Sequence, residues 1–325
     1  MAERIQEISG LAEKYRGGVV AIGNFDGVHR GHQAVLAEAL EIAKARGTHL
    51  HLLTFEPHPR TTFKPDEPVY RITPANLKAR LLGHCGVTAI FEQEFTRDYA
   101  AMSAEDFIND VLVRDLGAVH VVTGGDFRFG KGRSGDAAML ANAGEELGFG
   151  TSLAADFEDE SGEVISSSRI RSLLEKGEVS QAAGLLGYRY TISGEVIHGK
   201  KLGRTLGYPT ANMAVPEETG LAPGIYAVRM RRADGTLHDG VASFGRRPTV
   251  EEPDAPLLLE TYVFDASPDL YGEICDVSLF GFLRSEEKFD GLDALVAQMK
   301  TDEAEARALL AGVRPLGQLD EAISF

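Results

Sequence analysis

Residues 23–32 read Gly-Asn-Phe-Asp-Gly-Val-His-Arg-Gly-His, and the organisation of the first half of the chain depends on this stretch. An apolar run at residues 19–22 precedes it, and apolar residues recur at helical spacing over residues 33–46. The stretch is therefore predicted to be a strand-to-helix turn at the carboxyl edge of an α/β sheet, where ligands bind. The unpaired N–H groups and positive dipole end of the following helix favour a phosphate, which His29 and His32 can both face.

The stretch is neither of the two common glycine-rich loops. It lacks the Gly-Lys-Ser/Thr of a P-loop and the Gly-x-Gly-x-x-Gly spacing of a dinucleotide-binding turn. Its His-x-Gly-His instead resembles the signature of the nucleotidyltransferase superfamily, which transfers nucleotidyl groups from ATP or CTP. The alternative is a tight turn with two solvated polar residues, and the position between a strand and a helix disfavours it.

The composition narrows the class of protein. The chain has 325 residues, which predicts about two domains, and its 43% hydrophobic content is ordinary for a globular protein. The formal net charge of −16 argues against binding to nucleic acid or to an anionic membrane surface, because the field repels polyanions. Small phosphorylated ligands need only a local positive site and are not excluded.

The sequence favours a cytoplasmic protein without a membrane segment. Charged residues stand at positions 3 and 4, where a secretory signal would have its apolar core, and no run approaches the roughly 20 apolar residues of a membrane span. Cys85 and Cys275 are far apart and are expected to be free thiols in a reducing compartment. No pattern supports a zinc site. The oligomeric state stays open, and weak self-association is allowed.

Up to about residue 155 the pattern alternates between strand and helix. Apolar runs predict strands at residues 19–22, 49–54, 87–91, 119–123 and 151–155. Helices are predicted at residues 33–46, 74–84, 103–115 and 137–147, with Pro74 and Ser103 as helix-start signals. This order predicts an α/β, Rossmann-like domain over residues 1–186, in which a parallel sheet carries helices on both faces.

The pattern changes at about Gly187. Runs with a period of two follow at residues 190–196, 224–230, 240–244, 257–264 and 275–280, several of them separated by turn signals. About six short strands predict a sandwich or a barrel, and residues 292–310 predict a terminal helix. We therefore expect a small β domain with a C-terminal helix over residues 187–325.

Two further stretches are expected beside the turn at 23–32. Residues 124–130, Gly-Gly-Asp-Phe-Arg-Phe-Gly, follow a predicted strand; their glycines permit close approach of a ligand, and Phe127 and Phe129 offer flat apolar surfaces. A glycine turn with core aromatics is an equal alternative. Residues 165–171, Ile-Ser-Ser-Ser-Arg-Ile-Arg, begin a helix that serines such as Ser166 and Ser167 can simply cap.

Arg169 and Arg171 are less easily explained as parts of a helix start. Cations in a first turn oppose the helix dipole by roughly 0.3–1 kcal/mol, and a bound anion would reverse that sign. We expect these arginines to bind triphosphate or pyrophosphate, and a solvated charge is the alternative.

The β domain has a candidate site of its own. Residues 198–212 read His-Gly-Lys-Lys-Leu-Gly-Arg-Thr-Leu-Gly-Tyr-Pro-Thr-Ala-Asn, which concentrates glycine and positive charge in an acidic protein. Thr210 and Asn212 lie on one side of an extended segment and offer hard oxygen ligands suited to Mg²⁺. A flexible basic hairpin is the alternative. The candidates for wrapping phosphates with backbone N–H groups and positive charge are Gly199, Lys200, Gly203 and Arg204.

Glu260 is the candidate base of this second site. With a period of two it shares a face with Leu258, Tyr262 and Phe264, where a carboxylate is costly unless it is paired or functional. Desolvation would raise its proton affinity, as a general base requires. An edge-strand carboxylate that reaches solvent is the alternative.

Together these stretches resemble the bacterial bifunctional riboflavin kinase/FMN adenylyltransferase (FAD synthetase) family over nearly the whole chain. Two of the motifs, Gly-Tyr-Pro-Thr-Ala-Asn and Asp-Leu-Tyr-Gly, belong to the kinase module and are not expected in other nucleotidyltransferases. The motifs are the stretch at 23–32, Thr-Phe-Glu-Pro-His-Pro at 54–59, and those at 124–130, 165–171, 207–212 and 269–272.

The resemblance implies two ATP- and Mg²⁺-dependent steps. A β-barrel module would phosphorylate riboflavin to FMN, and the nucleotidyltransferase module would join FMN to AMP from ATP, giving FAD and pyrophosphate. Glu260 then matches the kinase base, and Thr210 and Asn212 match the Mg²⁺ and nucleotide ligands. In the other module, the residues implied at the ATP phosphates are His29 and His32 with Gly23, Asn24 and Asp26 nearby; Asp126 falls on the flavin side.

One departure and three rival functions remain. Ser243-Phe244 replaces an Asn-containing turn of many relatives, which leaves the flavin contacts there in doubt. The rivals are a nucleotidyltransferase of other specificity, such as a cytidylyltransferase, a flavin carrier without turnover, and an RNA-binding protein on a synthetase-like fold. The 198–212 loop, the intact phosphate-site residues and the net charge argue against them in that order.

Overall fold

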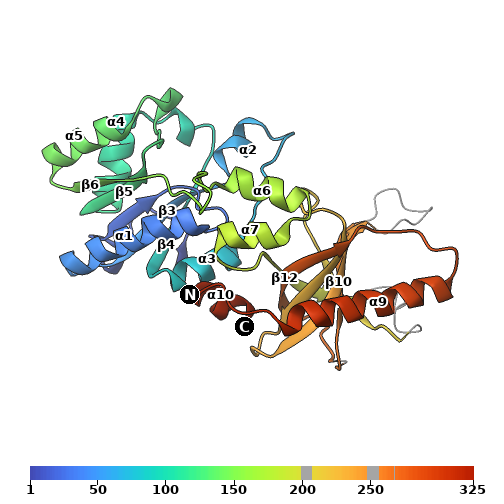
Figure 1. The fold of residues 1–325 in the computed structure, drawn as a ribbon. Helices are drawn as coiled ribbons and strands as arrows, with labels where there is room; N and C mark the ends of the chain where they lie inside the picture. Colours follow the sequence, from blue (N-terminus) through green and yellow to red (C-terminus); the bar gives the residue numbers. More distant parts are fainter. Residues whose placement is uncertain (199–206, 247–255, 267) are drawn as a thin grey trace. The chain divides into compact units, whose positions relative to one another are not determined.

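Figure 1 shows the fold in a computed structural model, which describes residues 1–198, 207–246, 256–266 and 268–325. The chain forms two compact units, Met1–Ser166 and Ser167–Phe325. Each unit contains a sheet of its own: an open parallel sheet in the first and a closed barrel in the second. The predicted fold class, a parallel α/β sheet followed by a small β-barrel, is thereby confirmed.

The first unit is built on a six-stranded sheet in the order β1-β4-β3-β2-β5-β6, and every neighbouring pair is parallel. The order reverses between β2 and β5. The carboxyl ends of these two neighbours therefore form the topological switch point at which such sheets bind ligands. The strands are β1 (Glu3–Ile5), β2 (Val19–Ile22), β3 (Leu50–Glu56), β4 (Val87–Glu94), β5 (His120–Gly124) and β6 (Gly150–Ala154).

Helices pack against this sheet. A π-helix, Phe107–Asp115, buries Phe107 and Val111 in one apolar cluster with Val20 and Val121 of the sheet. α1 packs against β2, β3 and β5, and right-handed crossovers place it on the opposite face. The other helices are α1 (Arg30–Arg46), α2 (Pro59–Phe63), α3 (Ala75–His84), α4 (Ala104–Asp106) and α5 (Ala137–Leu147), with short 3₁₀ turns between them.

The second unit begins with α6 (Ser167–Glu175) and α7 (Val179–Leu186) and continues as a closed antiparallel barrel in the order β10-β11-β8-β7-β12-β9. α9 (Leu292–Ala311) packs on β9, β10 and β12, and α10 (Gln318–Ser324) packs on β9. The strands are β7 (Thr191–Ile197), β8 (Thr210–Ala214), β9 (Gly224–Arg231), β10 (Leu237–Arg246), β11 (Leu257–Val263) and β12 (Ile274–Arg284).

The compact units divide the chain earlier than residue 186, where the predicted domain boundary lies. α6 and α7 pack with the barrel: the backbone N–H of Ala222 donates to Leu174 O at 2.9 Å, and Ser180 Oγ donates to Phe280 O at 3.1 Å. The sequence predicts the helix that begins at residues 165–171 and gives no prediction for α7, and a helical pattern carries no information about which sheet a helix covers.

Candidate active sites

The turn between β2 and α1 contains the predicted phosphate site. The N–H of Gly23 donates to Leu53 O at 3.1 Å, which ties the start of the turn to the neighbouring strand. Phe25 and Val28 have positive φ values of 47° and 38°, which is costly for any side chain and most of all for a β-branched one. Such a backbone persists only where surrounding contacts determine it, and it is common at ligand sites.

His29 and His32 stack on one another at the start of α1, with ring centroids 3.6 Å apart. His29 Nδ1 accepts the backbone N–H of His32 at 3.3 Å, so His29 is the N-cap of the helix. Burial lowers the pKa of His32 well below its usual value, and His29 and Lys78 add to this. His32 is therefore neutral at pH 7, and within the described residues its buried Nδ1 has no hydrogen-bond partner.

Asn24 and Asp26 of the same turn bind different neighbours. Asp26 is buried, and its carboxylate accepts the backbone N–H groups of Ile72 and Thr73 at 3.1 and 3.0 Å, which fastens that loop to the turn. Asn24 Nδ2 lies 3.2 Å from His58 Nε2. In the described part of the chain, the buried Oδ1 of Asn24 has no partner. Asn24 thus keeps a polar atom for a ligand, whereas the contacts of Asp26 hold the loop.

A buried charged cluster beside this turn was missed by the sequence analysis. Lys78 of α3 is 1% exposed, and its Nζ donates to Glu56 Oε1 at 3.0 Å and to Thr54 Oγ1 at 3.5 Å. Arg71 pairs with the same oxygen of Glu56. Burial lowers the pKa of Lys78, and the Glu56 carboxylate opposes this. The position of Lys78 in the apolar stripe of its helix could have indicated a buried, functional lysine. Arg71 lies in a loop, where no sequence pattern indicates its role.

Residues 124–130 follow β5 at the same edge of the sheet. Phe129 is buried with its ring 5.2 Å from that of Phe107, and the half-buried Phe127 stacks on it at 5.5 Å. Asp126 is exposed, and the N–H of Phe127 donates to Gly124 O at 3.1 Å, which closes a turn. Phe129 is therefore a core aromatic, whereas Phe127 and Asp126 are accessible.

A second aromatic group, also not singled out from the sequence, lies where β3 ends. The ring of Phe55 is 5.7 Å from that of Phe95, which in turn is 5.9 Å from Tyr99 and 6.1 Å from Phe63. Phe63 is 53% exposed, which is unusual for so large an apolar side chain beside other aromatics. The group offers an apolar surface to a planar ligand.

The predicted anion site at 165–171 falls on the division between the units. Ser166 is the last residue of the first unit, and Ser167, Arg169 and Arg171 belong to α6 of the second. Both arginines are half-buried. The grouping of these residues with the turn at 23–32 stays a prediction.

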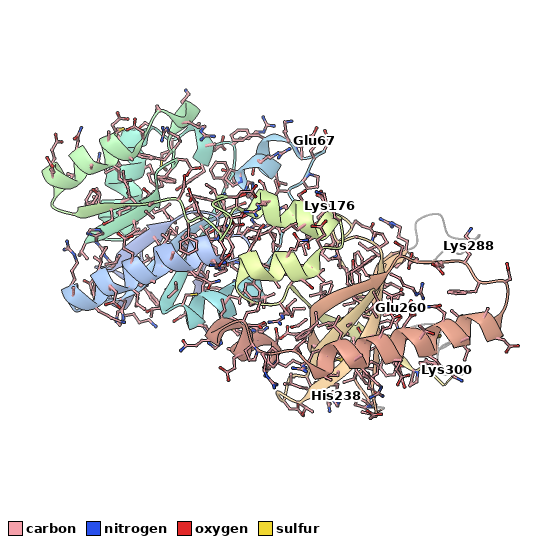
Figure 2. The ribbon with its side chains drawn as sticks, in the orientation of Figure 1. Glu67, Lys176, His238, Glu260, Lys288 and Lys300 are labelled. Atoms are coloured by element: carbon pink, nitrogen blue, oxygen red, sulfur yellow. The ribbon has the colours of Figure 1, made fainter. Side chains whose placement is uncertain are left out.

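The second predicted site lies on the barrel, where Figure 2 labels Glu260. Gly199, Lys200, Gly203 and Arg204 are outside the described residues, and their part in phosphate binding stays a prediction. Thr210 and Asn212 lie on β8, and Asn212 stands directly opposite Glu260 of β11.

Directly paired residues of neighbouring strands point to the same face of a sheet. Leu259 and Thr261, which alternate with Glu260, are 0% and 1% exposed and point into the barrel, whereas Glu260 is half-buried. Asn212 and Glu260 therefore share the outer face. The predicted sharing of a face between Glu260 and Tyr262 follows from the same alternation.

A second carboxyl group, Glu286, lies beside Glu260. Ser243 is paired with Glu260 across β10 and β11, and its Oγ donates to Glu286 Oε1 at 3.4 Å. Burial raises the pKa of Glu286, the Ser243 hydroxyl opposes this, and the nearby charge of Glu260 adds to it. Phe244 is 1% exposed and belongs to the barrel core. The departure at 243–244 therefore puts a serine at the site and an aromatic ring in the core.

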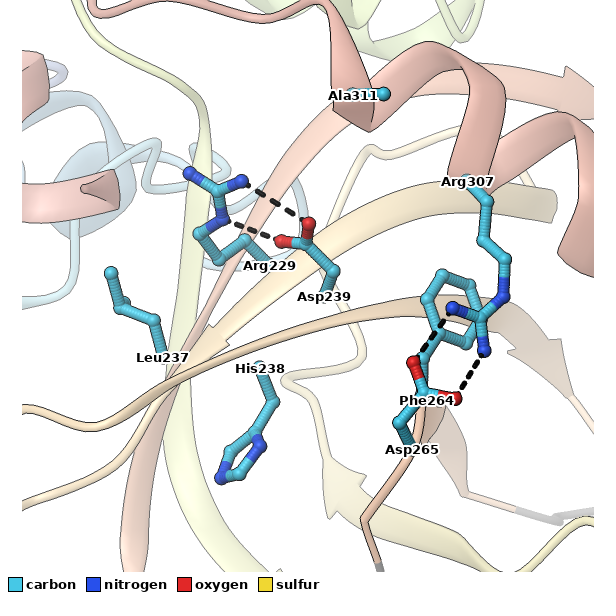
Figure 3. A pocket seen from close by; sticks show the side chains of 8 residues that line it. All are labelled: Arg229, Leu237, His238, Asp239, Phe264, Asp265, Arg307 and Ala311. Atoms are coloured by element: carbon cyan, nitrogen blue, oxygen red, sulfur yellow. Dashed lines mark hydrogen bonds and ion pairs between the residues drawn. The ribbon is translucent and has the colours of Figure 1, made fainter.

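A cavity of about 460 Å³ opens on the barrel unit beside α9 (Figure 3). Its two arginines are already paired: Arg229 Nε lies 2.6 Å from Asp239, and Arg307 Nη1 lies 2.8 Å from Asp265. Glu260, Thr210 and Asn212 are not among its lining residues in the described part of the chain. This cavity is therefore not the predicted kinase centre.

Comparison with known proteins matches both units. The FAD synthetase family model matches residues 11–169, and the riboflavin kinase family model matches residues 186–310. The bifunctional riboflavin kinase/FMN adenylyltransferase of Escherichia coli (strain K12) is 40% identical over 299 residues, which cover 92% of this chain and 95% of that one. The chain belongs to the bifunctional riboflavin kinase/FMN adenylyltransferase family.

Other relatives agree with this family. The bifunctional riboflavin kinase/FMN adenylyltransferase of Listeria monocytogenes serovar 1/2a is 39% identical, over 90% of this chain and 92% of that one. A solved structure named a macrolide-efflux protein, from Streptococcus pneumoniae, superposes with a TM-score of 0.83 at 30% identity and covers 94% of this chain and 98% of that one. Among the described residues, no helix is long and apolar enough to span a membrane.

The FAD synthetase match ends at residue 169 and so includes the first turn of α6. Arg169 therefore belongs by sequence to the FAD synthetase region, although α6 packs with the barrel. In residues 1–198, 207–246, 256–266 and 268–325, no three His, Cys, Asp or Glu side chains gather as a metal site would require.

Proposed function

We propose that this chain makes FAD from riboflavin in two ATP-dependent steps. The kinase region transfers the γ-phosphoryl group of ATP to the 5′-hydroxyl of riboflavin, giving FMN and ADP. The FAD synthetase region joins the FMN phosphate to the α-phosphorus of a second ATP and releases pyrophosphate. The observation that carries the proposal is the match of both regions, in one chain, to bifunctional enzymes over 92% of its length.

The outer face around Glu260 supports the first step. A hydroxyl nucleophile must lose its proton as it attacks, and Glu260 is the proposed base that accepts it. Asn212, directly opposite, and Thr210 on the same strand provide oxygen donors of the kind that Mg²⁺ prefers. Mg²⁺ bound there would neutralise phosphate charge. Riboflavin would lie against the Ser243–Glu286 side of this face.

The β2–α1 turn supports the second step, which needs no base because the FMN phosphate is already an anionic nucleophile. We assign the ATP phosphates to the first turn of α1, where His32 is neutral and can donate a hydrogen bond. Gly23 and Asn24 line this turn, and Arg169 and Arg171 would add charge. The aromatic surfaces of Phe127 and of Phe63 with Tyr99 fit the flavin ring.

The test is incubation of the purified chain with riboflavin, ATP and Mg²⁺, followed by chromatographic separation of the flavins. FMN should form first and FAD should follow. FMN without FAD, or unchanged riboflavin, would contradict the proposal, and activity with CTP in place of ATP would favour a cytidylyltransferase. We place the protein in the cytoplasm, where ATP is available and where free Cys85 and Cys275 suit a reducing environment.

A further inference from the structure

The Glu56 cluster, consisting of Glu56, Arg71 and Lys78, has no part in the roles assigned above. We propose that Arg71, held in place by Glu56 and Lys78, binds the phosphate group of FMN during adenylyl transfer. This inference rests on the proposed function and names a binding residue for its second substrate.

The first argument is position. The loop that carries Arg71 is fastened to the phosphate turn: Asp26 accepts the N–H of Ile72 at 3.1 Å, and the N–H of Gly27 donates to Thr73 Oγ1 at 2.9 Å. Glu56 ends β3, which is the strand next to β2. Arg71 is therefore anchored on both sides, at the carboxyl edge where the reaction is expected.

The second argument is charge. Arg71 and Lys78 share one oxygen of Glu56, so the three groups together carry one net positive charge at a largely buried place. Asp26 is close enough to favour the charged form of Lys78, so its carboxylate offsets part of this charge. Arg71 shares its carboxylate partner with Lys78, so Glu56 alone does not balance both cations, and the guanidinium group can still attract a phosphate.

The third argument is the hydrogen-bonding capacity of the guanidinium group. Arg71 Nη2 is paired with Glu56, whereas Nη1 is buried and has no partner in the part of the chain that the structure describes. A buried hydrogen-bond donor of a cationic group is rarely left without an acceptor. Guanidinium donors fit phosphate oxygens in geometry and charge, so the free Nη1 is the atom that we assign to the ligand.

The choice of FMN over ATP follows from the neighbours of the cluster. Phe55 and Glu56 are consecutive residues at the end of β3, so their side chains leave opposite faces of the strand; Phe55 begins the aromatic group that includes Phe95 and Tyr99, and one ligand lying across the end of the strand can reach both faces. The histidines at the first turn of α1 follow β2 and are assigned to ATP; Lys78 is close enough to His32 to act on its charge, so the phosphates of the two substrates would meet beside the cluster. The aromatic surface and the free arginine donor on the β3 side then suit one substrate that carries both a planar ring and a phosphate.

Lys78 is a positioning residue in this arrangement. Its ammonium group holds Glu56 through a 3.0 Å contact and fixes the carboxylate that orients Arg71. Without it, Glu56 would face Arg71 alone and the pair would carry no net charge. Lys78→Met should therefore weaken FMN binding, and less than a change of Arg71 itself.

The experiment measures FAD formation from FMN and ATP in Arg71→Met, Arg71→Lys and the wild-type chain, after the wild type has been shown to make FAD. In Arg71→Met we expect the KM for FMN to rise at least tenfold, the scale of a charge-assisted hydrogen bond, and the KM for ATP to stay within about twofold. Arg71→Lys should give an intermediate rise. Arg114→Met is the matched control, because Arg114 is an exposed arginine of the same unit paired with Asp110.

Lumiflavin, which has the isoalloxazine ring but neither ribityl chain nor phosphate, separates binding of the phosphate from folding. Its inhibition constant against FMN should be the same in Arg71→Met as in the wild type. An unchanged KM for FMN overturns the proposal, as does an equal rise in the KM for ATP. Loss of lumiflavin inhibition together with FMN binding would make Arg71 structural and would also overturn it. A wild type that makes no FAD would instead refute the proposed function.

Discussion

His29 has an observed role, the cap of α1, and a proposed role at the ATP phosphates, and substitutions can separate the two. His29→Ala removes both, whereas His29→Asn restores a side chain that caps helices well. We expect both variants to lose FAD formation from FMN by about a hundredfold or more, the usual scale for one preorganised donor at a reacting phosphate. Riboflavin phosphorylation should stay within about twofold in both.

The difference in capping between the two variants should change only the stability of the protein. His29→Asn should melt above His29→Ala, by the equivalent of about 1 kcal/mol for a lost cap. Thermal unfolding of both variants, next to the assay of the two activities, provides the measurement. An Asn variant with normal FAD formation would mean that the imidazole serves only as a cap.

His51 predicts how acid weakens the first unit. It is 1% exposed on β3, and burial lowers its pKa to about 4, with His49 adding to this. Between pH 6.5 and this value, His51 binds a proton in the unfolded chain but not in the folded one. The contribution of the neutral, buried His51 to the free energy of unfolding is therefore fully present above pH 6.5 and is lost as the pH falls. The loss between pH 7 and pH 5 should be about 2 kcal/mol.

His51→Leu tests this, because it removes the titrating group and keeps most of the volume. Urea unfolding of the first unit at pH 7 and pH 5 should show a smaller pH dependence in this variant than in the wild type. His84→Gln, a change of an exposed histidine in the same unit, should leave the dependence as it is. If His51→Leu lost as much stability between pH 7 and pH 5 as the wild type, His51 would not be the group responsible.

At the scale of elements, the proposed kinase centre depends on strand register. β10, β11 and β8 align Ser243, Glu260 and Asn212 in one row across three strands, and a slip of one residue would turn all three into the barrel. Glu260→Gln preserves size and register and removes the base. It should lower FMN formation by about 10²–10⁴-fold, and FAD formation from added FMN should be unchanged.

Glu195→Gln is the matched control for Glu260, since Glu195 is an exposed carboxylate on β7 of the same barrel. Both variants are assayed for ADP formation with riboflavin and for FAD formation with FMN. A kinase rate in Glu260→Gln within a few-fold of the wild type would remove Glu260 as the base and would direct attention to Glu286.

Regular elements could be predicted from the sequence because their signals are local. The run at residues 19–22 is β2 to the residue, and residues 292–310 lie within α9. β1 was missed because Glu3 and Arg4 are polar and the strand has three residues, and α10 because its seven residues have no preceding periodic pattern. The Glu56 cluster was missed because its members come from three segments, and only the fold brings them together.

The same distinction holds for the sites. Motifs placed His29 and His32 at a turn and Glu260 on a strand, since each lies in one continuous stretch. The contact of Glu286 with Ser243 joins β10 to the segment after β12, and no spacing in the sequence announces it. The contacts of the site residues with distant segments of the chain follow from strand register and packing, which depend on the whole core.

At the scale of the whole molecule, the division of the chain bears on how the two activities can be separated. α6 and α7, which belong to the unit that contains the barrel, carry the buried side chains of Ile170, Leu174, Val179 and Leu186. A fragment that starts at Tyr188 loses these side chains and the hydrogen bonds to Ala222 and Phe280, whereas one that starts at Ser167 keeps them.

Both fragments, 167–325 and 188–325, should therefore phosphorylate riboflavin, because Thr210, Asn212, Glu260 and Glu286 are common to them. The longer fragment should be more stable, because it keeps the buried apolar side chains of α6 and α7 and the two hydrogen bonds to Ala222 and Phe280. Thermal unfolding and FMN production are measured on both, with the full chain as reference. Equal melting temperatures would mean that α6 and α7 add no stability to the barrel. Loss of FMN production in both fragments, with an active full chain, would mean that the kinase needs the first unit.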